Sequence, residues 1–364
     1  MKKSFTLLIG CITLLGFGQI PAGYYNSATG TGYALKSQLF AIISAGTIDP
    51  GYGALYTTYL TSDVDLYYEN NGTVLDMYTE NPTGTDLCEY TYGVNQDDGS
   101  GGTAECQKYN REHIIPQSVF SSATPMHSDA HFVVPSDKYV NAQRGNLPFG
   151  VVNTANWTSS NGSKRGSNLN SGYSAGYTGI VFEPINEFKG DIARMYFYFI
   201  TRYQDQVAGW NYDMFNGTSN QVLTTTFLNI LLTWHLNDPV SQREIDRNNA
   251  IYAYQNNRNP FIDNPDFVCD IWPTQCTALS SEDFVLNNVA VFPNPSKNGE
   301  FSITTTAELK NIAIYNVNGQ LVQEIKNPNA IETSTYKVNN LATGFYMLQL
   351  QTENASVTKK VIVN

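Results

Sequence analysis

The spacing of apolar side chains predicts helices in one part of the chain and short strands in another. Apolar residues recur at helical spacing in four segments, which are expected to pack on a core: 34–45, 191–203, 224–236 and 241–256. Ser241 followed by Glu244 three residues later is typical of a capping box at a helix start. From Val289 to Asn364 apolar and polar residues alternate in short runs, which predicts a small β-sandwich.

The stretch from Tyr109 to Gly150 combines two apolar runs, each closed by proline, with a helical segment expected from Ser136. This order predicts strand, loop, strand and helix. Elsewhere, Asn-Asn-Gly within 65–92 favours a hairpin. Residues 153–179, rich in Asn, Ser, Gly and Thr, are expected to form a long surface loop, and 259–272 an irregular segment.

These patterns divide the chain into four parts. Lys2 and Lys3 precede the apolar run 5–17, as in a cleaved signal peptide, here residues 1–19. The sequence around Cys11 also fits a lipoprotein box, which would leave a lipidated cysteine instead. Residues 20–278 are expected to form a mixed α+β domain, 279–288 a linker and 289–364 an all-β domain. Beyond the signal, the sequence has no apolar run of membrane-spanning length.

Export implies an oxidising compartment, where an even number of cysteines favours disulfides. Removal of the signal leaves four cysteines, whose spacing is not that of a zinc knuckle. Local pairing is the favoured one of three possible connectivities: Cys88 with Cys106 and Cys269 with Cys276.

The formal net charge of −11 is unevenly distributed. Residues 37–107 contain eleven acids and no lysine or arginine, whereas 108–202 contain nine basic residues against six acids. A locally basic surface can bind a polyanion even on an acidic protein. The alternative is that these scattered cations only keep the surface soluble.

Three of the four histidines, His113, His127 and His131, lie between Tyr109 and Gly150. Phosphodiester hydrolysis needs a base that activates water and a cation that neutralises the phosphate. A neutral histidine can be that base, and carboxylate or amide oxygens can hold a hard divalent cation. Glu112 beside His113, with Asn141 on the expected helix, supplies these groups. Because neighbours on a regular strand point to opposite faces, Glu112 and His113 can share one phosphate only where the strand becomes irregular.

Taken singly, each of these residues has an ordinary structural interpretation, and only their ordered combination indicates a site. The pieces NREHIIPQS, SDAHFVVPSDKYVNAQRGN and FEPINEFKGDIARMYFYFITRY together resemble the secreted endonuclease I family, whose fold is a ββα-metal (His-Me finger) nuclease. The resemblance covers about residues 20–272. Members of this family generally cut DNA, and often RNA, leaving 5′-phosphates.

The resemblance implies a role for each matching residue. His113 is expected to be the general base, with Glu112 and Asn141 holding Mg²⁺, which Mn²⁺ can replace. Related nucleases can carry a phosphate-stabilising arginine between His113 and His131, but this sequence has no lysine or arginine there. That role is therefore expected to fall to one of two downstream arginines, Arg144 or Arg194. Supporting positions are expected at Asp129 and His131, and contacts with the nucleic-acid backbone at Arg111, Lys164 and Arg165.

The C-terminal part resembles the sorting domain of the type IX secretion system, on the motifs VFPNPSKNGEFSI, IYNVNGQLV, LATGFYMLQL and VTKKVIVN. It is expected to be an export address with no part in chemistry, the alternative being a sandwich that binds carbohydrate or a surface. The sequence thus predicts a secreted or surface-associated, monomeric, largely nonspecific and Mg²⁺-dependent endonuclease that acts on DNA. It does not decide between DNA and RNA preference. The competing interpretation is a surface-displayed adhesion protein with an inactive nuclease fold. A peptidase is not favoured, because REHIIP lacks the His-Glu-x-x-His arrangement.

Overall fold

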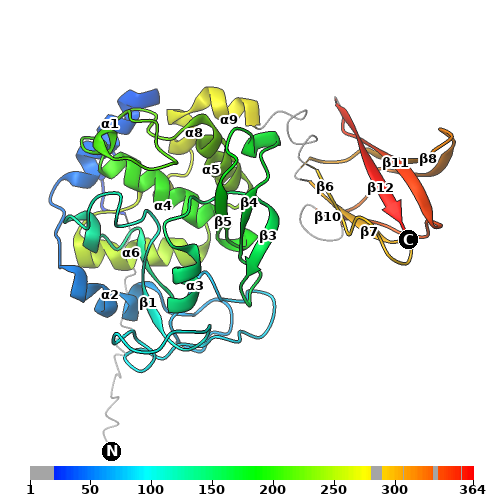
Figure 1. Ribbon diagram of the computed structural model, residues 1–364. Coiled ribbons are helices and arrows are strands. Elements are labelled where there is room, and N and C mark those ends of the chain that lie inside the picture. The colour runs from blue at the N-terminus through cyan, green and yellow to red at the C-terminus, as the bar shows by residue number, and fades with distance from the viewer. Residues whose placement is uncertain (1–19, 280–288, 306, 331–334, 354) are drawn as a thin grey trace, which may run out of the picture.

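A computed structural model describes residues 20–279, 289–305, 307–330, 335–353 and 355–364 of the protein. The expected signal peptide, with the alternative at Cys11, lies outside the described residues, as does all of the expected linker except Leu279. Buried apolar side chains form two clusters, one drawn from residues 35–279 and one from 289–363. The first is surrounded by helices and short strands, and the second by strands alone (Figure 1).

Helices cover most of the first cluster: α1 (Gly32–Ser44), α2 (Leu55–Ser62), α3 (Lys138–Arg144), α4 (Lys189–Arg202), α5 (Thr225–Asn237), α6 (Gln242–Gln255), α7 (Pro260–Asp263), α8 (Phe267–Ile271) and α9 (Pro273–Leu279). Every residue of α4 from Gly190 to Thr201 is buried, and α4 packs against α1, α5 and α7 (Figure 1). The predicted buried helix is therefore confirmed. At the start of α6, Ser241 and Glu244 form the predicted capping box.

Strand β1 (Tyr109–His113) pairs antiparallel with β2 (Val133–Asp137), and α3 follows directly. This confirms the predicted order of strand, loop, strand and helix. The helix begins two residues later than expected, because Ser136 still belongs to β2 and the Asp137 carboxylate caps the helix by accepting a hydrogen bond from the Val140 N–H. Among the described residues, no helix is long and apolar enough to cross a bilayer.

The prediction of a loop at 153–179 is wrong. Strands β3 (Val152–Thr158), β4 (Lys164–Asn168) and β5 (Ile180–Glu183) form an antiparallel sheet in the order β3-β4-β5. Most of β3 is exposed, so backbone hydrogen bonds rather than a buried face hold it, and its sequence shows no apolar alternation. The segment 259–272 was also expected to be irregular, yet it contains the short helices α7 and α8.

The predicted hairpin within 65–92 forms no regular strand ladder, although residues 63–65 and 73–75 share antiparallel backbone hydrogen bonds on either side of the Asn-Asn-Gly turn. Between α2 and β1 the chain contains no helix or strand, and its pairing is limited to isolated bridges such as Val64 with Val74 and Val74 with Tyr90. Side-chain oxygens here accept hydrogen bonds from backbone N–H groups that would otherwise pair in a strand ladder. Asp65 accepts from the N–H groups of Tyr67 and Tyr68, and Asn71 accepts from that of Thr73. Such local bonds compete with regular structure.

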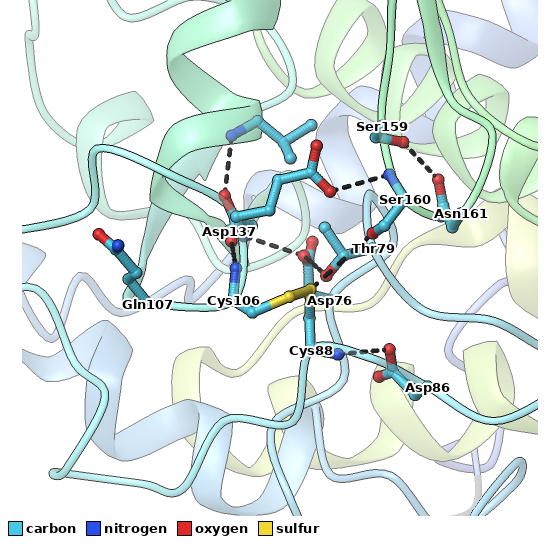
Figure 2. The surroundings of a disulfide bond; sticks show 12 residues. Asp76, Thr79, Asp86, Cys88, Cys106, Gln107, Asp137, Ser159, Ser160 and Asn161 are labelled. Atoms are coloured by element: carbon cyan, nitrogen blue, oxygen red, sulfur yellow. Dashed lines mark hydrogen bonds between the residues drawn. A yellow bond between two sulfur atoms is a disulfide. The ribbon is translucent and has the colours of Figure 1, made fainter.

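Two disulfides have the predicted pairing, Cys88 with Cys106 and Cys269 with Cys276. The Cys106 N–H donates to the Asp137 carboxylate at 2.8 Å, so the first disulfide is joined to the residue that caps α3 (Figure 2). The Asp137 N–H in turn donates to Asp76 at 2.9 Å. The segment between α2 and β1 is thereby attached to the start of the helix that carries Asn141.

The C-terminal part is all-β, as predicted. One antiparallel sheet has the order β10-β7-β6 and the other β12-β11-β8-β9. Their strands are β6 (Ala290–Phe292), β7 (Phe301–Thr304), β8 (Asn311–Asn316), β9 (Leu321–Lys326), β10 (Thr335–Val338), β11 (Gly344–Gln351) and β12 (Ser356–Val363). Alternate residues, such as Leu348 and Leu350 on β11, form the second apolar cluster. Gly319, in the predicted Asn-Gly turn, has a φ of 75°.

Candidate active site

A polar cavity of about 220 Å³ opens along β1 and continues to the loop after it. Its walls come from β1, α3, the helical turn at Tyr52 and the loop at Pro116 and Gln117. It brings together five of the residues that the sequence singled out: Arg111, Glu112, His113, Asn141 and Arg144. The other lining residues are Tyr52, Tyr56, Asp97, Asn110, Pro116, Gln117, Gly145 and Asn146.

Glu112 and His113 are successive residues of β1, and they contact different groups. The Glu112 carboxylate accepts a hydrogen bond from the Tyr78 hydroxyl at 2.8 Å and is ion-paired with Arg144 at 3.0 Å. His113 instead faces His127. Both neighbours line one cavity because β1 ends at His113 and the cavity extends past that end. The expected break in the strand therefore lies immediately after the pair.

The contacts of His113 determine which ring nitrogen carries its proton. Nε2 lies 3.2 Å from the backbone carbonyl oxygen of His127. A carbonyl oxygen can only accept, so Nε2 carries the hydrogen and Nδ1 has the free lone pair. Burial lowers the pKa of His113 from 6.5 to about 3, which keeps the ring neutral at physiological pH. His113 is thus unprotonated in this structure, with its free lone pair at Nδ1.

His127, to which sequence reasoning gave no role, positions His113. Its ring stacks on His113 with centroids 5.2 Å apart and an interplanar angle of 9°. Its other contacts are Tyr52, stacked at 3.8 Å, and Gln117, whose side-chain oxygen lies 3.1 Å from Nε2. A signal was present in the sequence, since His127 lies in the loop between the two strands, but only the tertiary structure brings it to His113.

Arg144 is 1% exposed and forms bonds inside the protein. Besides Glu112, its guanidinium donates to the carbonyl oxygens of His113 and Ile114. Burial raises the pKa of Glu112, and the neighbouring Arg144 charge opposes that rise. Arg144 therefore holds the end of β1 and the Glu112 carboxylate in place.

Arg194 does not reach the cavity. It is fully buried in α4, donates to both Glu244 carboxylate oxygens and to the Asp238 carbonyl, and is not among the cavity residues. The geometry therefore contradicts the assignment of a phosphate-stabilising role to Arg194. The sequence signal was misleading because a buried, ion-paired arginine cannot be told from an exposed one by its spacing.

The Asn141 side chain on α3 is oriented by a partner that sequence reasoning missed. Its Nδ2 donates to the Asn110 side-chain oxygen at 2.9 Å, which leaves no described hydrogen bond at Asn141 Oδ1. Glu112 and Asn141 thus present a carboxylate and an amide oxygen to one polar cavity. An all-oxygen donor set of this kind fits a hard divalent cation such as Mg²⁺.

Asp129 and His131 lie outside the cavity in a buried hydrogen-bond network. The Asp129 carboxylate accepts from the hydroxyls of Tyr198 and Tyr203 and from the Gln255 amide. His131 Nε2 lies 3.1 Å from the Asn257 carbonyl oxygen. This network joins the loop before β2 to α4 and the end of α6, as expected of supporting residues.

Of the three cations expected at a nucleic-acid backbone, only Arg111 lines the cavity. Its guanidinium lies over the rings of Tyr52 at 3.5 Å and Tyr56 at 4.4 Å. Lys164 and Arg165 lie on β4 and are not cavity residues, and Arg165 bonds to Asn156 and Gln143. Contacts of Lys164 and Arg165 with a long substrate stay a prediction.

His131 gives a testable dependence of stability on pH. Burial lowers its pKa from 6.5 to about 4, so between these values the unfolded chain binds a proton that the folded chain does not. The contribution of neutral His131 to the free energy of unfolding is complete above pH 6.5. It declines by about 1.4 kcal/mol per pH unit as the pH falls towards 4. Urea unfolding of the wild type and a His131→Gln variant should show the wild type losing stability relative to the variant across this window. If the difference in free energy of unfolding between the wild type and His131→Gln does not change with pH, this account is contradicted.

The combination of β1, β2 and α3 around Glu112, His113 and Asn141 defines the class of ββα-site phosphodiester hydrolases. Residues 31–266 match the model of the Endonuclease I family, and residues 290–364 match that of the secretion system C-terminal sorting domain. The chain belongs to the Endonuclease I family, with a sorting domain at its C-terminal end. It is a secreted or cell-surface nuclease.

Two relatives support this assignment. The chain is 34% identical to an extracellular ribonuclease of Bacillus amyloliquefaciens over 254 residues, which cover 68% of this chain and 78% of the relative. It is also 34% identical to an extracellular ribonuclease of Bacillus subtilis (strain 168) over 255 residues, 69% of this chain and 78% of the relative.

Proposed function

We propose that the protein is an exported, Mg²⁺-dependent endonuclease that hydrolyses DNA and RNA with little sequence preference and leaves 5′-phosphates. The observation that carries this proposal is the shared cavity of Glu112, His113 and Asn141, which contains a neutral base beside two oxygen donors. The relatives named as extracellular ribonucleases favour RNA as a substrate. The family resemblance favours DNA.

In the proposed reaction, His113 Nδ1 takes a proton from the attacking water, whose oxygen forms the new bond to phosphorus while the bond to the 3′-oxygen breaks. The departing 3′-oxygen takes a proton from solvent water. Glu112 and Asn141 would hold the cation, which would neutralise charge on the phosphate and the leaving oxygen. The His127 carbonyl fixes the tautomer of His113, and Arg144 keeps Glu112 in place. Arg111, at the cavity, contacts a phosphate of the substrate.

A cleavage assay tests the function and separates it from the alternative of an adhesion protein. Plasmid DNA and a structured RNA are each incubated with the protein in MgCl₂, in MnCl₂ and in EDTA. We expect both polymers to be cut with either metal, and EDTA to abolish cleavage because no cation then neutralises the phosphate. Binding of both polymers without cleavage under any condition would favour the inactive fold.

Export completes the proposed function. We propose that residues 1–19 direct the chain through the inner membrane and that residues 289–364 direct it through type IX machinery, with the nuclease domain of residues 20–278 acting as a monomer. The match over 290–364 supports a sorting role for the β-sandwich. All residues that line the described cavity lie between Tyr52 and Asn146, in the nuclease domain.

A further inference from the structure

A second group of carboxylates lies apart from the cavity. Asp65, Glu69 and Glu80 each offer an oxygen, and these atoms lie within 4.8 Å of one another. Asp65 is 1% exposed and Glu80 is 2% exposed. None of the three residues lines the cavity that contains His113.

Two oxygens of this group are buried without a hydrogen-bond partner. Asp65 Oδ1 accepts from the N–H groups of Tyr67 and Tyr68, whereas Asp65 Oδ2 accepts nothing. Glu80 Oε1 is likewise unpartnered. In the described part of the chain these are the only carboxylate oxygens in that condition. A buried acceptor left unpaired is costly, so each of these oxygens is available to bind a donor or a cation.

The other buried carboxylates among the described residues have partners. Asp76, Asp129 and Asp137 have no arginine beside them, but both oxygens of each accept hydrogen bonds. Arginines pair with Glu112, Asp63, Asp191, Glu244 and Asp263. No ion pair among the described residues involves Asp65, Glu69 or Glu80, and the segment 37–107 contains no lysine or arginine. The charge that would balance these carboxylates is therefore not supplied by a neighbouring side chain.

We propose that Asp65, Glu69 and Glu80 bind a Ca²⁺ ion that stabilises the segment 63–108. All donors are oxygens, and the group contains neither histidine nor cysteine, which indicates a hard cation. The oxygens of the three residues lie within 4.8 Å of one another, which allows one ion to reach all of them. Ca²⁺ is the better match because it accepts several carboxylates in irregular geometry, whereas Mg²⁺ demands near-octahedral geometry and usually keeps several waters.

The position of the site explains what the ion would do. Residues 63–108 contain no helix or strand, although Tyr78 from this segment donates to Glu112 and Asp97 lines the active-site cavity. Glu69 accepts a hydrogen bond from the Asp86 N–H, and the Asp86 carboxylate accepts one from the Cys88 N–H (Figure 2). A cation at Asp65, Glu69 and Glu80 would thus join residues 65–69 to Glu80 and, through Asp86, to the disulfide.

The alternative is a proton in place of the ion. Burial and the neighbouring carboxylates of Asp86, Glu69 and Asp65 raise the pKa of Glu80 to about 9, so without a cation Glu80 would stay protonated and bond to Glu69. The two states differ in a measurable way. A Glu80→Gln variant resembles the protonated form, because its neutral amide can donate to Glu69, but it lacks the charge that attracts Ca²⁺.

The test uses the full chain in an Asn141→Ala background, which removes an oxygen proposed to hold the catalytic metal. CaCl₂ is titrated by calorimetry, and thermal unfolding is followed with CaCl₂ and with EGTA. We expect one Ca²⁺ bound per chain and, at about one hundred times the Kd, a rise in Tm of about 5–10 °C. Glu80→Gln should raise the Kd at least about tenfold and remove the Tm shift, because the charge of the ligand set sets the affinity.

Glu89→Gln is the matched control, since Glu89 is an exposed acid of the same segment and should leave both values unchanged. Asp65→Asn is the second ligand variant, because its amide oxygen can still accept from Tyr67 and Tyr68. Absence of Ca²⁺ binding, or a Tm shift that survives both ligand variants, would overturn the proposal. An equal Tm shift with MgCl₂ would overturn the choice of Ca²⁺. The inference does not rest on the proposed catalytic reaction, so it can fail while DNA cleavage is observed.

Discussion

Replacement of His113 by alanine is expected to lower the rate of phosphodiester cleavage by about 10²–10⁴-fold while the affinity for DNA is retained. The reason is that His113 Nδ1 has the free lone pair that is proposed to take the proton of the attacking water, with Nε2 fixed by the His127 carbonyl. Nucleic-acid binding depends on surface cations and on the cation held by Glu112 and Asn141, which this substitution leaves in place. Cleavage rates under single-turnover conditions and filter binding at fixed salt measure the two effects separately.

His127→Ala is the matched control for this variant. The bond to His113 comes from the backbone carbonyl of residue 127, which alanine keeps. The substitution removes the ring stacking on His113 and Tyr52 and the exposed contact with Gln117. Loss of such stacking costs about 0.5–1.5 kcal/mol, which corresponds to at most about a tenfold fall in rate. Wild-type activity in His113→Ala, or an equal loss in both variants, would refute the assignment of His113 as the base.

Replacement of Arg144 by alanine is expected to destabilise the protein by about 3–5 kcal/mol. The substitution leaves the buried Glu112 carboxylate without its ion-pair partner and removes the donors to the carbonyl oxygens of His113 and Ile114. Without the opposing charge, burial raises the pKa of Glu112 further, so the variant should also need more Mg²⁺ for half-maximal cleavage. Urea unfolding and a Mg²⁺ titration of the remaining activity measure the two effects.

Arg144→Lys and Arg194→Ala are the comparisons. Lysine keeps a positive charge beside Glu112 but lacks the planar fork that reaches two carbonyl oxygens, so its stability should lie between those of the wild type and Arg144→Ala. Arg194→Ala breaks another buried pair, with Glu244, and should lower stability without changing the Mg²⁺ requirement of the folded fraction. A Mg²⁺ requirement that is unchanged in Arg144→Ala would mean that Arg144 does not support the Glu112 carboxylate.

Several elements could be predicted because their signal is local. Helix α4 was found from its apolar spacing, α6 from the Ser241 and Glu244 pair, and the β-strands of the C-terminal part from their alternation. The polar sheet of β3 and β4 was missed, because strands that bury no continuous face have no alternating pattern. The hairpin expected near Asn71 forms no regular strand ladder for a related reason, since side-chain acceptors take backbone N–H groups that such a ladder would use.

The sequence by itself determined the family resemblance, the two-part composition, the disulfide pairing and the residues Glu112, His113 and Asn141, because these depend on residue type and order along the chain. The tertiary structure decided which atoms meet. It placed the His127 carbonyl on His113, Asn110 on Asn141, and Arg144 rather than Arg194 beside Glu112. These contacts span 14 to 32 residues of chain, and no local periodicity encodes the direction in which a buried side chain points.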